Sequence, residues 1–125
     1  MSTIMVVDDD REMGRLLKTL FELEHHQVTV TPTYREILPV MRQVLPDAVL
    51  MDVRVHGQET VDLVRQIRQD ERIAHIPVVM TSGGDCKQRC LEAGADRFVL
   101  KPFLPDQLVE MVVGLAEQQC RLRCE

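Results

Sequence analysis

Short apolar runs alternate with longer amphipathic stretches along the chain. The apolar runs are rich in Val, Ile and Met, and they lie at Thr3–Val7, Val28–Thr31, Ala48–Met51, Pro77–Met80 and Phe98–Leu100. Runs of this length and content are typical of strands that are buried on both faces of a parallel sheet. The pattern therefore predicts five strands.

The stretches between these runs carry apolar residues at helical spacing. The first stretch has an i, i+3, i+4, i+7 stripe, which is formed by Met13, Leu16, Leu17, Leu20 and Phe21. Further helices are expected near Tyr34–Leu45, from Val61 onward, from an N-cap at Asp85 to Gly94, and from Leu104-Pro105-Asp106 onward.

Strand and helix alternate five times, and this order decides the fold class. It predicts an α/β fold with a doubly wound, five-stranded parallel sheet of the flavodoxin-like kind and helices on both faces. The second helix is irregular, because Pro39 lies inside its pattern and should kink or shorten it. A chain of 125 residues has the size of one domain, so we interpret residues 1–125 as a single domain.

Composition narrows the classes of partner. The net charge is −5, with 20 Asp and Glu against 15 Lys and Arg, which argues against direct binding of nucleic acid. No apolar run reaches the roughly 20 residues of a membrane span, and the first residues lack the basic segment of a signal peptide. We expect a cytoplasmic protein whose four cysteines are reduced thiols.

Polar side chains gather where the predicted strands end. Asp8-Asp9-Asp10 follow the first strand, Asp52 the third, Thr81-Ser82 the fourth and Lys101-Pro102 the fifth. Ligands of open α/β sheets bind at this edge, so we expect these side chains to lie together. Asp10 is the exception, since its place before the first helix is that of an N-cap.

This set of side chains has the chemistry of phosphoryl transfer. Crowded carboxylates repel one another, which raises their pKa values unless a divalent cation neutralises them, and an all-oxygen site suits Mg²⁺. The single lysine adds a second positive charge, and a hydroxyl can hydrogen-bond a phosphoryl oxygen. A carboxylate is then the expected nucleophile.

Four segments that carry these strand ends resemble the receiver domains of bacterial two-component response regulators. The segments are Ile4–Asp10, Pro46–Asp52, Ile76–Ser82 and Ala93–Phe103, and the resemblance extends from Ile4 to about Arg121. It implies a signalling switch that accepts a phosphoryl group from a sensor histidine kinase or a phosphotransfer protein. Such a domain catalyses its own phosphorylation and dephosphorylation and turns over no separate substrate.

The resemblance also implies a metal site. Asp52 is the expected phosphoacceptor and a ligand of Mg²⁺. Asp9 is expected to bind the ion directly and Asp8 through a water molecule, and the backbone carbonyl of Arg54 completes the protein ligands.

The resemblance further implies a switch. Lys101 is expected to pair with the acyl phosphate, and its peptide bond to Pro102 is cis in the family. Thr81 is expected to move to the phosphoryl group, and Phe98 holds the position of the aromatic residue that turns inward when the threonine moves. The face built from the fourth helix, the fifth strand and the fifth helix would then change its affinity for an output domain or a partner protein.

The loop after Asp52 departs from the family pattern. The family usually has Asp-x-x-Met-Pro and a glycine eight positions after the Asp, whereas this chain has Val55-His56 and then Thr60. Gly57 offers another route to a tight turn. We interpret His56 as a surface loop residue, with a nearby proton carrier as the alternative. The loop leaves open where the Arg54 carbonyl points.

Arg54 and Gly83 occupy two variable positions that influence the lifetime of the acyl phosphate in the family. Gly83 has no side chain that could orient an attacking water molecule. We therefore expect a phosphoryl lifetime that these two residues do not shorten.

Two other features have competing interpretations. Cys86 and Cys90 are four residues apart, as are Cys120 and Cys124, which allows a metal or redox pair, but a small buried apolar role for Cys90 suffices. The last helix has a predicted core stripe and a second apolar stripe beside it, which fits a partner or homodimer surface as well as extra burial. The core stripe contains Leu108, Met111, Val112 and Leu115, and the second stripe Val109, Val113, Ala116 and Cys120.

Two alternatives to a phosphorylation switch stay open. The first is an interaction module that keeps the fold but has lost productive phosphorylation, and the altered loop after Asp52 supports it. The second is a small phosphatase of the haloacid dehalogenase type, with Asp8-x-Asp10 as its motif and Asp8 as its nucleophile. The phosphatase interpretation leaves Asp52 without its central role.

Overall fold

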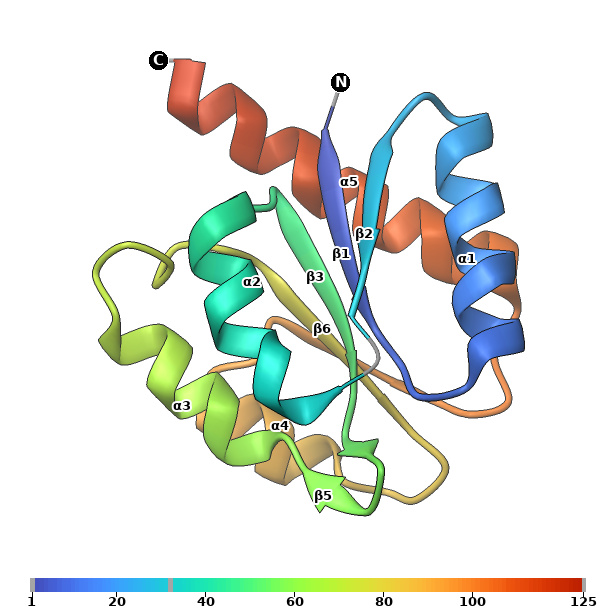
Figure 1. The fold of residues 1–125 in the computed structure, drawn as a ribbon, viewed down its shortest axis with the longest axis vertical. Helices are drawn as coiled ribbons and strands as arrows, with labels where there is room; N and C mark the ends of the chain where they lie inside the picture. The colour runs from blue at the N-terminus through green and yellow to red at the C-terminus, as the bar shows by residue number, and fades with distance from the viewer. Residues whose placement is uncertain (1, 32, 125) are drawn as a thin grey trace.

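Five parallel strands form one sheet, as the alternating pattern predicts. The computed structural model describes residues 2–31 and 33–124. The strands are β1 (Thr3–Val7), β2 (Gln27–Val30), β3 (Ala48–Asp52), β6 (Val78–Ser82) and β7 (Arg97–Leu100). They lie in the order β2-β1-β3-β6-β7, and each neighbouring pair is parallel (Figure 1). This is the flavodoxin-like order, and it brings the carboxyl ends of the strands to one edge.

The central strands are buried on both faces, whereas the edge strands are not. The apolar residues of β1, β3 and β6 lie in the core, but those of β2 and β7 are half-buried or exposed. An edge strand has a neighbour on one side only, so the prediction of full burial is wrong for these two. The predicted bounds also shift slightly, since Thr31 follows β2 and Pro77 precedes β6.

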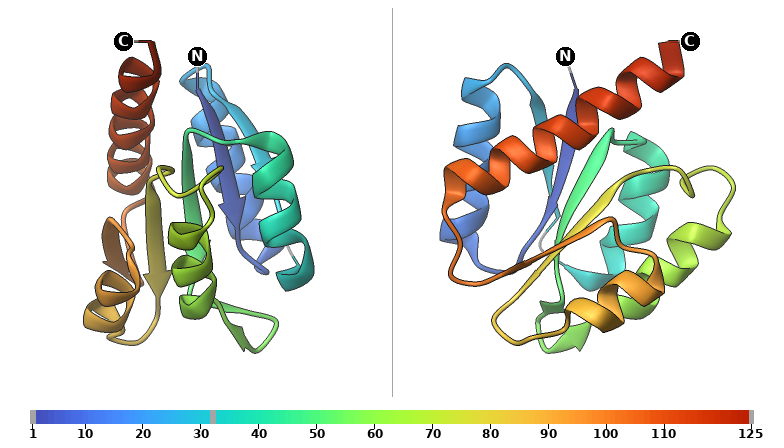
Figure 2. Two further views of the ribbon diagram at one scale, coloured as in Figure 1. Left: turned by 90° about the vertical axis from the view of Figure 1, so that its left-hand side faces the viewer. Right: turned by 180° about the vertical axis from the view of Figure 1, so that it is seen from behind.

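Helices cover both faces of the sheet (Figure 2). They are α1 (Arg11–Leu23), α2 (Ile37–Val44), α3 (Val61–Gln69), α4 (Lys87–Ala93) and α5 (Pro105–Cys124). Alternate residues of β1 show how the two layers divide. Ile4 and Val6 pack with α1 and α5, whereas Met5 and Val7 pack with α2, α3 and α4. This period of two is what a strand buried on both faces requires.

The first helix begins at its predicted cap. The Asp10 carboxylate accepts hydrogen bonds from the amides of Glu12 and Met13, at 3.1 and 3.3 Å. One residue of the predicted stripe is misplaced, because 43% of the Leu16 surface is exposed. Leu17 and Phe21 of the stripe are buried in the core. The buried stripe is therefore narrower than the apolar stripe.

The second and fourth helices differ from prediction at their starts. A 3-10 turn (Tyr34–Glu36) precedes α2, and Pro39 lies in the first turn of α2, where a helix leaves its N–H groups unpaired. The predicted N-cap of α4 is wrong, since Cys86 occupies that position and Asp85 precedes it. The Asp85 carboxylate still accepts a hydrogen bond from the Lys87 amide at 3.3 Å. The predicted end at Gly94 is confirmed by its left-handed φ of 118°.

The core face of α5 is rotated relative to the predicted one. Leu108 and Val112 are buried as predicted, but Met111 and Leu115 are only partly buried. The second stripe lies against the sheet instead, because Val109, Val113 and Ala116 are buried. Extra burial therefore explains most of the second stripe.

A short antiparallel hairpin interrupts the strand and helix alternation after Asp52. It consists of β4 (Arg54–Val55) and β5 (Gln58–Glu59), paired Arg54 with Glu59 and Val55 with Gln58. Its two-residue turn is His56-Gly57, with φ of 49° and 79°. Positive φ at both positions defines a type I′ hairpin turn, which Gly57 favours. The chain thus makes its tight turn through Gly57, by a route that periodicity did not predict.

Within the part of the chain that the structure describes, no helix is both long and apolar enough to cross a membrane.

Candidate functional site

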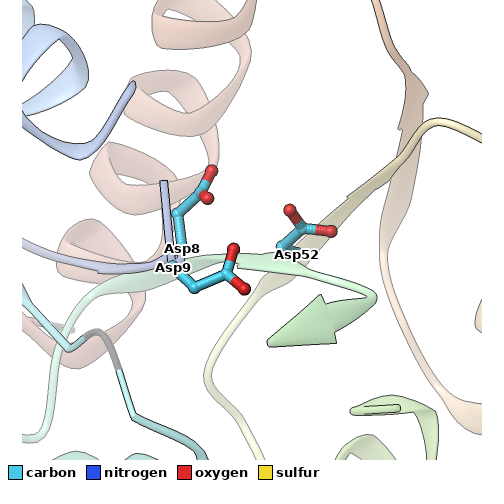
Figure 3. A group of neighbouring side chains, drawn as sticks. All are labelled: Asp8, Asp9 and Asp52. Atoms are coloured by element: carbon cyan, nitrogen blue, oxygen red, sulfur yellow. The ribbon is translucent and has the colours of Figure 1, made fainter. Parts of the chain in front are cut away.

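Three carboxylates meet at the carboxyl edge of the sheet. Asp8 and Asp9 directly follow β1, and Asp52 is the last residue of the neighbouring strand β3. Each offers a carboxylate oxygen, and these three oxygens lie within 4.8 Å of one another. Figure 3 shows the Asp9 carboxylate directed toward Asp52, with Asp8 beside Asp9. The predicted acidic cluster is therefore assembled by the parallel pairing of β1 with β3.

Asp52 is the buried centre of this cluster. Its residue is 8% exposed, and both of its carboxylate oxygens accept hydrogen bonds. Lys101 Nζ donates to Asp52 Oδ2 at 2.7 Å, and the Arg54 amide donates to Asp52 Oδ1 at 3.2 Å. Lys101 follows β7, two strands away, and its peptide bond to Pro102 is cis. The lone lysine of the predicted set thus points into the cluster.

The electrostatics of the site are dominated by burial and by the contact between Asp52 and Lys101. Burial by itself lowers the pKa of Lys101, but its hydrogen bond to Asp52 and the charges of Asp52, Asp8 and Asp10 outweigh this, so the pKa is raised. Lys101 therefore stays a full positive charge in the site.

The negative charge of Asp8 is disfavoured mainly by burial and, to a smaller extent, by the like charges around it. Burial raises the pKa of Asp8, and the negative charges of Asp52 and Asp10 raise it further, against the lowering effect of the Asp10 amide and of Lys101. The Asp10 amide donates to Asp8 Oδ1 at 2.9 Å. A divalent cation would relieve this repulsion, and carboxylate oxygens are the ligands that Mg²⁺ prefers. The donor set fits magnesium.

The hairpin turn contacts Asp9, the second carboxylate of the cluster. The His56 amide donates to Asp9 Oδ2 at 2.7 Å. The imidazole lies further away, with its Nδ1 3.9 Å from the same oxygen, and 61% of the side chain is exposed. The backbone of His56 therefore holds Asp9, while its side chain lies at the surface as interpreted from the sequence.

Asp10 takes no part in the cluster, since its carboxylate caps α1. The carboxylate that a phosphatase motif Asp8-x-Asp10 would use is therefore turned toward helix amides. The geometry supports the N-cap interpretation of Asp10 and gives the phosphatase alternative no second acid.

The predicted switch residues lie on β6, which is the neighbour of β3, and on β7, the strand beyond it. Thr81 is buried on β6, directly opposite Asp52 in the strand register. Phe98 is half-buried on β7, opposite Met80, and packs against the core on the side of α3 and α4. Ser82, which follows Thr81, accepts a hydrogen bond from the Gly84 amide at 3.1 Å through its hydroxyl.

The two variable positions lie in open surroundings. The Arg54 side chain is exposed, and its guanidinium lies 4.0 Å from the Glu59 carboxylate. A Cβ atom built on Gly83 would meet no other atom within 4 Å. Gly83 thus leaves space beside the site, as expected for a glycine at this position.

The cysteines lie outside the acidic site. Cys90 is fully buried in the core, and burial raises the pKa of its thiol to about 11. The Cys86 Sγ lies 3.8 Å from the Ser82 hydroxyl, and the Cys120 Sγ lies 3.4 Å from the Ser2 hydroxyl. The side chain of Cys124 lies outside the described residues. A protonated buried thiol fits the small apolar role expected for Cys90.

Sequence reasoning missed one residue next to the site. From the sequence, Thr60 stands out only as a departure from the family pattern. Its hydroxyl donates to the backbone carbonyl of Asp52 at 2.8 Å. The contact joins residues that are eight positions apart and depends on the hairpin, so no local pattern predicts it.

Comparisons with known proteins agree with this geometry. A family model described as the response regulator receiver domain matches residues 4–113. The phosphate regulon transcriptional regulatory protein PhoB of Pseudomonas aeruginosa is 31% identical over 110 residues, which are 86% of this chain and 48% of that protein. The DNA-binding response regulator MtrA of Mycolicibacterium smegmatis is 35% identical over 112 residues, 87% of this chain and 48% of that protein. The chain thus spans about half the length of these two relatives.

Solved structures show the same fold. The receiver domain of the Francisella response regulator 1452 superimposes with a TM-score of 0.86 at 26% identity, covering 94% of this chain and 98% of that one. A putative response regulator from Chloroflexus aurantiacus gives a TM-score of 0.84 at 30% identity, covering 93% and 98%. With the acidic cluster at the carboxyl edge, these matches show that the chain belongs to the response regulator receiver domains of two-component systems.

Proposed function

We propose that this domain is a phosphorylation-dependent signalling switch in which Asp52 accepts the phosphoryl group. The observation that carries the proposal is the 2.7 Å contact between Lys101 Nζ and Asp52 Oδ2 beside two further carboxylates. A buried carboxylate, a fixed ammonium and a cation-binding acidic pair are the parts of a phosphoryl-transfer site.

The proposed donor is a phosphohistidine on a sensor histidine kinase or a phosphotransfer protein. An Asp52 oxygen attacks the phosphorus, a P–O bond forms and the N–P bond breaks. The electron pair of that bond returns to the imidazole, which leaves as a neutral ring after it takes up a proton. Lys101 pairs with the negative charge on the phosphoryl oxygens. Because the phosphohistidine is made from ATP, the proposal places the domain in the cytoplasm.

Asp8, Asp9 and Asp52 are the side chains that would hold Mg²⁺, with the Arg54 carbonyl as a backbone ligand. The raised pKa of Asp8 supports a cation here, because burial and its neighbours disfavour its bare charge. A strand residue directs its N–H and C=O to the same side. Since the Arg54 amide donates to Asp52 Oδ1, this rule directs the Arg54 carbonyl toward the site. When bound, the ion supplies charge neutralisation for the crowded oxygens.

The proposed switch connects Asp52 with a surface of the domain. Thr81 lies next to Asp52 in the sheet, so its hydroxyl can reach a phosphoryl oxygen by a small movement. Phe98 on β7 then repacks, and the surface formed by α4, β7 and α5 changes its affinity for an output domain or a partner protein. Met111 and Leu115 are two apolar residues of α5 that stay partly uncovered and could contact such a partner or a second copy of the chain.

The proposal takes residues 1–125 as one receiver domain that does not itself bind nucleic acid. PhoB and MtrA are named as transcriptional or DNA-binding regulators, which indicates the kind of output domain that this surface would control. The phosphoryl lifetime is proposed to be one that Arg54 and Gly83 do not shorten, because Gly83 offers no side chain to position a water molecule.

Intact-mass analysis with acetyl phosphate and Mg²⁺ tests the function. The wild type should gain the mass of one phosphoryl group, and the Asp52→Asn variant should gain none. An unlabelled wild type would instead favour an interaction module that works without phosphorylation. Labelling that persists in Asp52→Asn and is lost in Asp8→Asn would point to Asp8 as the nucleophile.

A further inference from the structure

Thr60 holds an unusual position for a threonine at the start of a helix. It is the N-cap residue of α3 and is fully buried. A threonine at an N-cap normally accepts a hydrogen bond from its own helix through its hydroxyl. Thr60 makes no such capping bond. Its hydroxyl is turned away from α3 and donates to the Asp52 carbonyl at 2.8 Å, with the Val53 carbonyl at 3.3 Å.

The Asp52 carbonyl is a group that the sheet itself leaves without a strand partner. Successive strand residues direct their backbone groups to opposite sides, and the Val53 amide donates toward β6, to the Thr81 carbonyl at 2.8 Å. The Asp52 carbonyl therefore faces the side of β1. On that side β1 has already ended, because its last residue, Val7, pairs with Met51. Thr60 supplies the missing donor to this buried carbonyl.

The contact also closes the base of the hairpin. The Thr60 amide donates to the Val53 carbonyl at 2.8 Å, so the backbone and the side chain of one residue bind two successive peptide groups. The peptide that follows Asp52 is thereby fixed in orientation. The Asp52 side chain and the Arg54 amide that bonds it both extend from this fixed segment.

We propose that Thr60 is a positioning residue for phosphoryl transfer, acting through the backbone of Asp52. This inference rests on the proposed function of Asp52. The hydroxyl of Thr60 keeps the Asp52 carboxylate aligned with Lys101 and with the acidic pair. In this chain Thr60 stands where the family usually has a glycine. Its hydroxyl stabilises the hairpin that this loop forms.

The test compares three variants by the rate of phosphorylation with acetyl phosphate, at saturating donor and Mg²⁺. Thr60→Val keeps the shape but removes the donor, and Thr60→Ser keeps the donor. Thr31→Val is the matched control, because Thr31 is an equally buried threonine that follows the edge strand β2. Rates are measured far below each melting midpoint, so that every variant is folded.

We expect Thr60→Val to slow labelling by about tenfold, as misplaced reacting groups do. Thr60→Ser should stay within roughly threefold of the wild type. Thr31→Val should be labelled at the rate of the wild type. A residue with only a structural role would lower the melting midpoint but leave the rate of the folded protein unchanged.

Equal rates for folded Thr60→Val and the wild type would overturn the inference and leave the proposed function intact. A wild type that takes no label would overturn the proposed function, and the role of Thr60 with it. If Thr60→Val does not fold, Thr60→Ala and Thr60→Ser decide the matter, because a slow Ala variant and a fast Ser variant support the hydroxyl, and equal rates contradict it.

Discussion

Two buried aspartates bracket β3, and they differ in what surrounds them. Asp47 directly precedes the strand and Asp52 ends it. Asp47 Oδ2 accepts a hydrogen bond from the Thr3 amide at 2.8 Å, and the Asp47 amide donates to the Thr3 carbonyl at 2.8 Å. At the amino edge of the sheet, the carboxylate thus joins the backbones of two neighbouring strands.

Asp52 has the same degree of burial but a different neighbourhood. Its partners include a lysine ammonium, and two more carboxylates lie beside it. The comparison teaches that burial alone does not mark a functional carboxylate. The difference is crowding: the carboxyl edge concentrates like charges that a structural site would avoid, together with a cation placed to compensate them.

The largest expected effect is on labelling by acetyl phosphate, which should distinguish Asp52 from Asp47. Asp52→Asn should abolish labelling by acetyl phosphate, because the nucleophile is gone. Asp47→Ala should still be labelled but should lose about 1–3 kcal/mol of unfolding free energy, since the partly buried Thr3 amide loses an acceptor. Intact mass and urea denaturation measure the two outcomes. Loss of labelling in folded Asp47→Ala would break the comparison.

Removing the positive charge of Lys101 should have the second largest effect on labelling. Lys101→Met keeps a long side chain but removes the charge opposite Asp52, so labelling should slow by about 100-fold. The rate under saturating Mg²⁺ and acetyl phosphate measures this effect. A rate close to that of the wild type would show that Lys101 only fills space.

Removing a crowded charge should affect stability more modestly. The pKa of Asp8 is raised mainly by burial, so its ionised form is disfavoured in the folded protein. The stability associated with the neutral carboxyl is present below its ordinary pKa of 3.8 and is lost as the pH rises through the folded-state pKa. Asp8→Asn stays neutral at every pH, so without Mg²⁺ it should melt a few degrees above the wild type near pH 7.

Two conditions sharpen this prediction. The difference in melting midpoint should disappear in acid, where Asp8 is neutral in both states, and saturating Mg²⁺ should reverse it, because the wild type keeps the ligand. Melting curves at several pH values, with Mg²⁺ or a chelator, measure both. A wild type that is the more stable protein at pH 7 without Mg²⁺ would contradict the conclusion that burial and neighbouring charges disfavour the ionised Asp8.

The smallest expected effect is a difference in alkylation rate between two cysteines, Cys86 near the edge of the site and Cys90 in the core. Cys86 is partly exposed beside Ser82, whereas Cys90 is buried and its thiol has a pKa of about 11. Iodoacetamide at pH 8 should modify Cys90 at least about tenfold more slowly than Cys86, because the thiolate is the reactive form. Peptide mapping measures the two rates, and equal rates would mean that the core opens readily.

Much of the fold follows from local patterns. Buried strands need apolar residues on both faces and helices need one apolar stripe, so alternating runs predicted the order of the elements. Asp10 and Gly94 marked helix ends because capping depends on backbone geometry that these residue types favour. The acidic cluster was predictable as well, since parallel pairing puts strand ends at one edge.

The predicted burial of helix residues is wrong where two adjacent faces of a helix are equally apolar. Either of two adjacent apolar stripes on α5 could face the sheet, and packing buried Val109 and Val113 rather than Met111 and Leu115. Leu16 fits the helical stripe of α1, yet it lies beyond the area that the sheet covers. Periodicity gives the face of a helix only to within about one residue position, which is a rotation that packing corrects.

The sequence by itself determined which side chains reach the carboxyl edge, because the apolar runs and the polar residues that follow them are encoded locally. Only the tertiary structure decided how they meet. The hairpin that places the His56 amide on Asp9, and the Thr60 hydroxyl on the Asp52 carbonyl, depends on contacts between segments that are distant in the chain. The physical reason is that a buried carbonyl or carboxylate takes whichever donor the folded backbone brings within reach, and no local pattern specifies that donor.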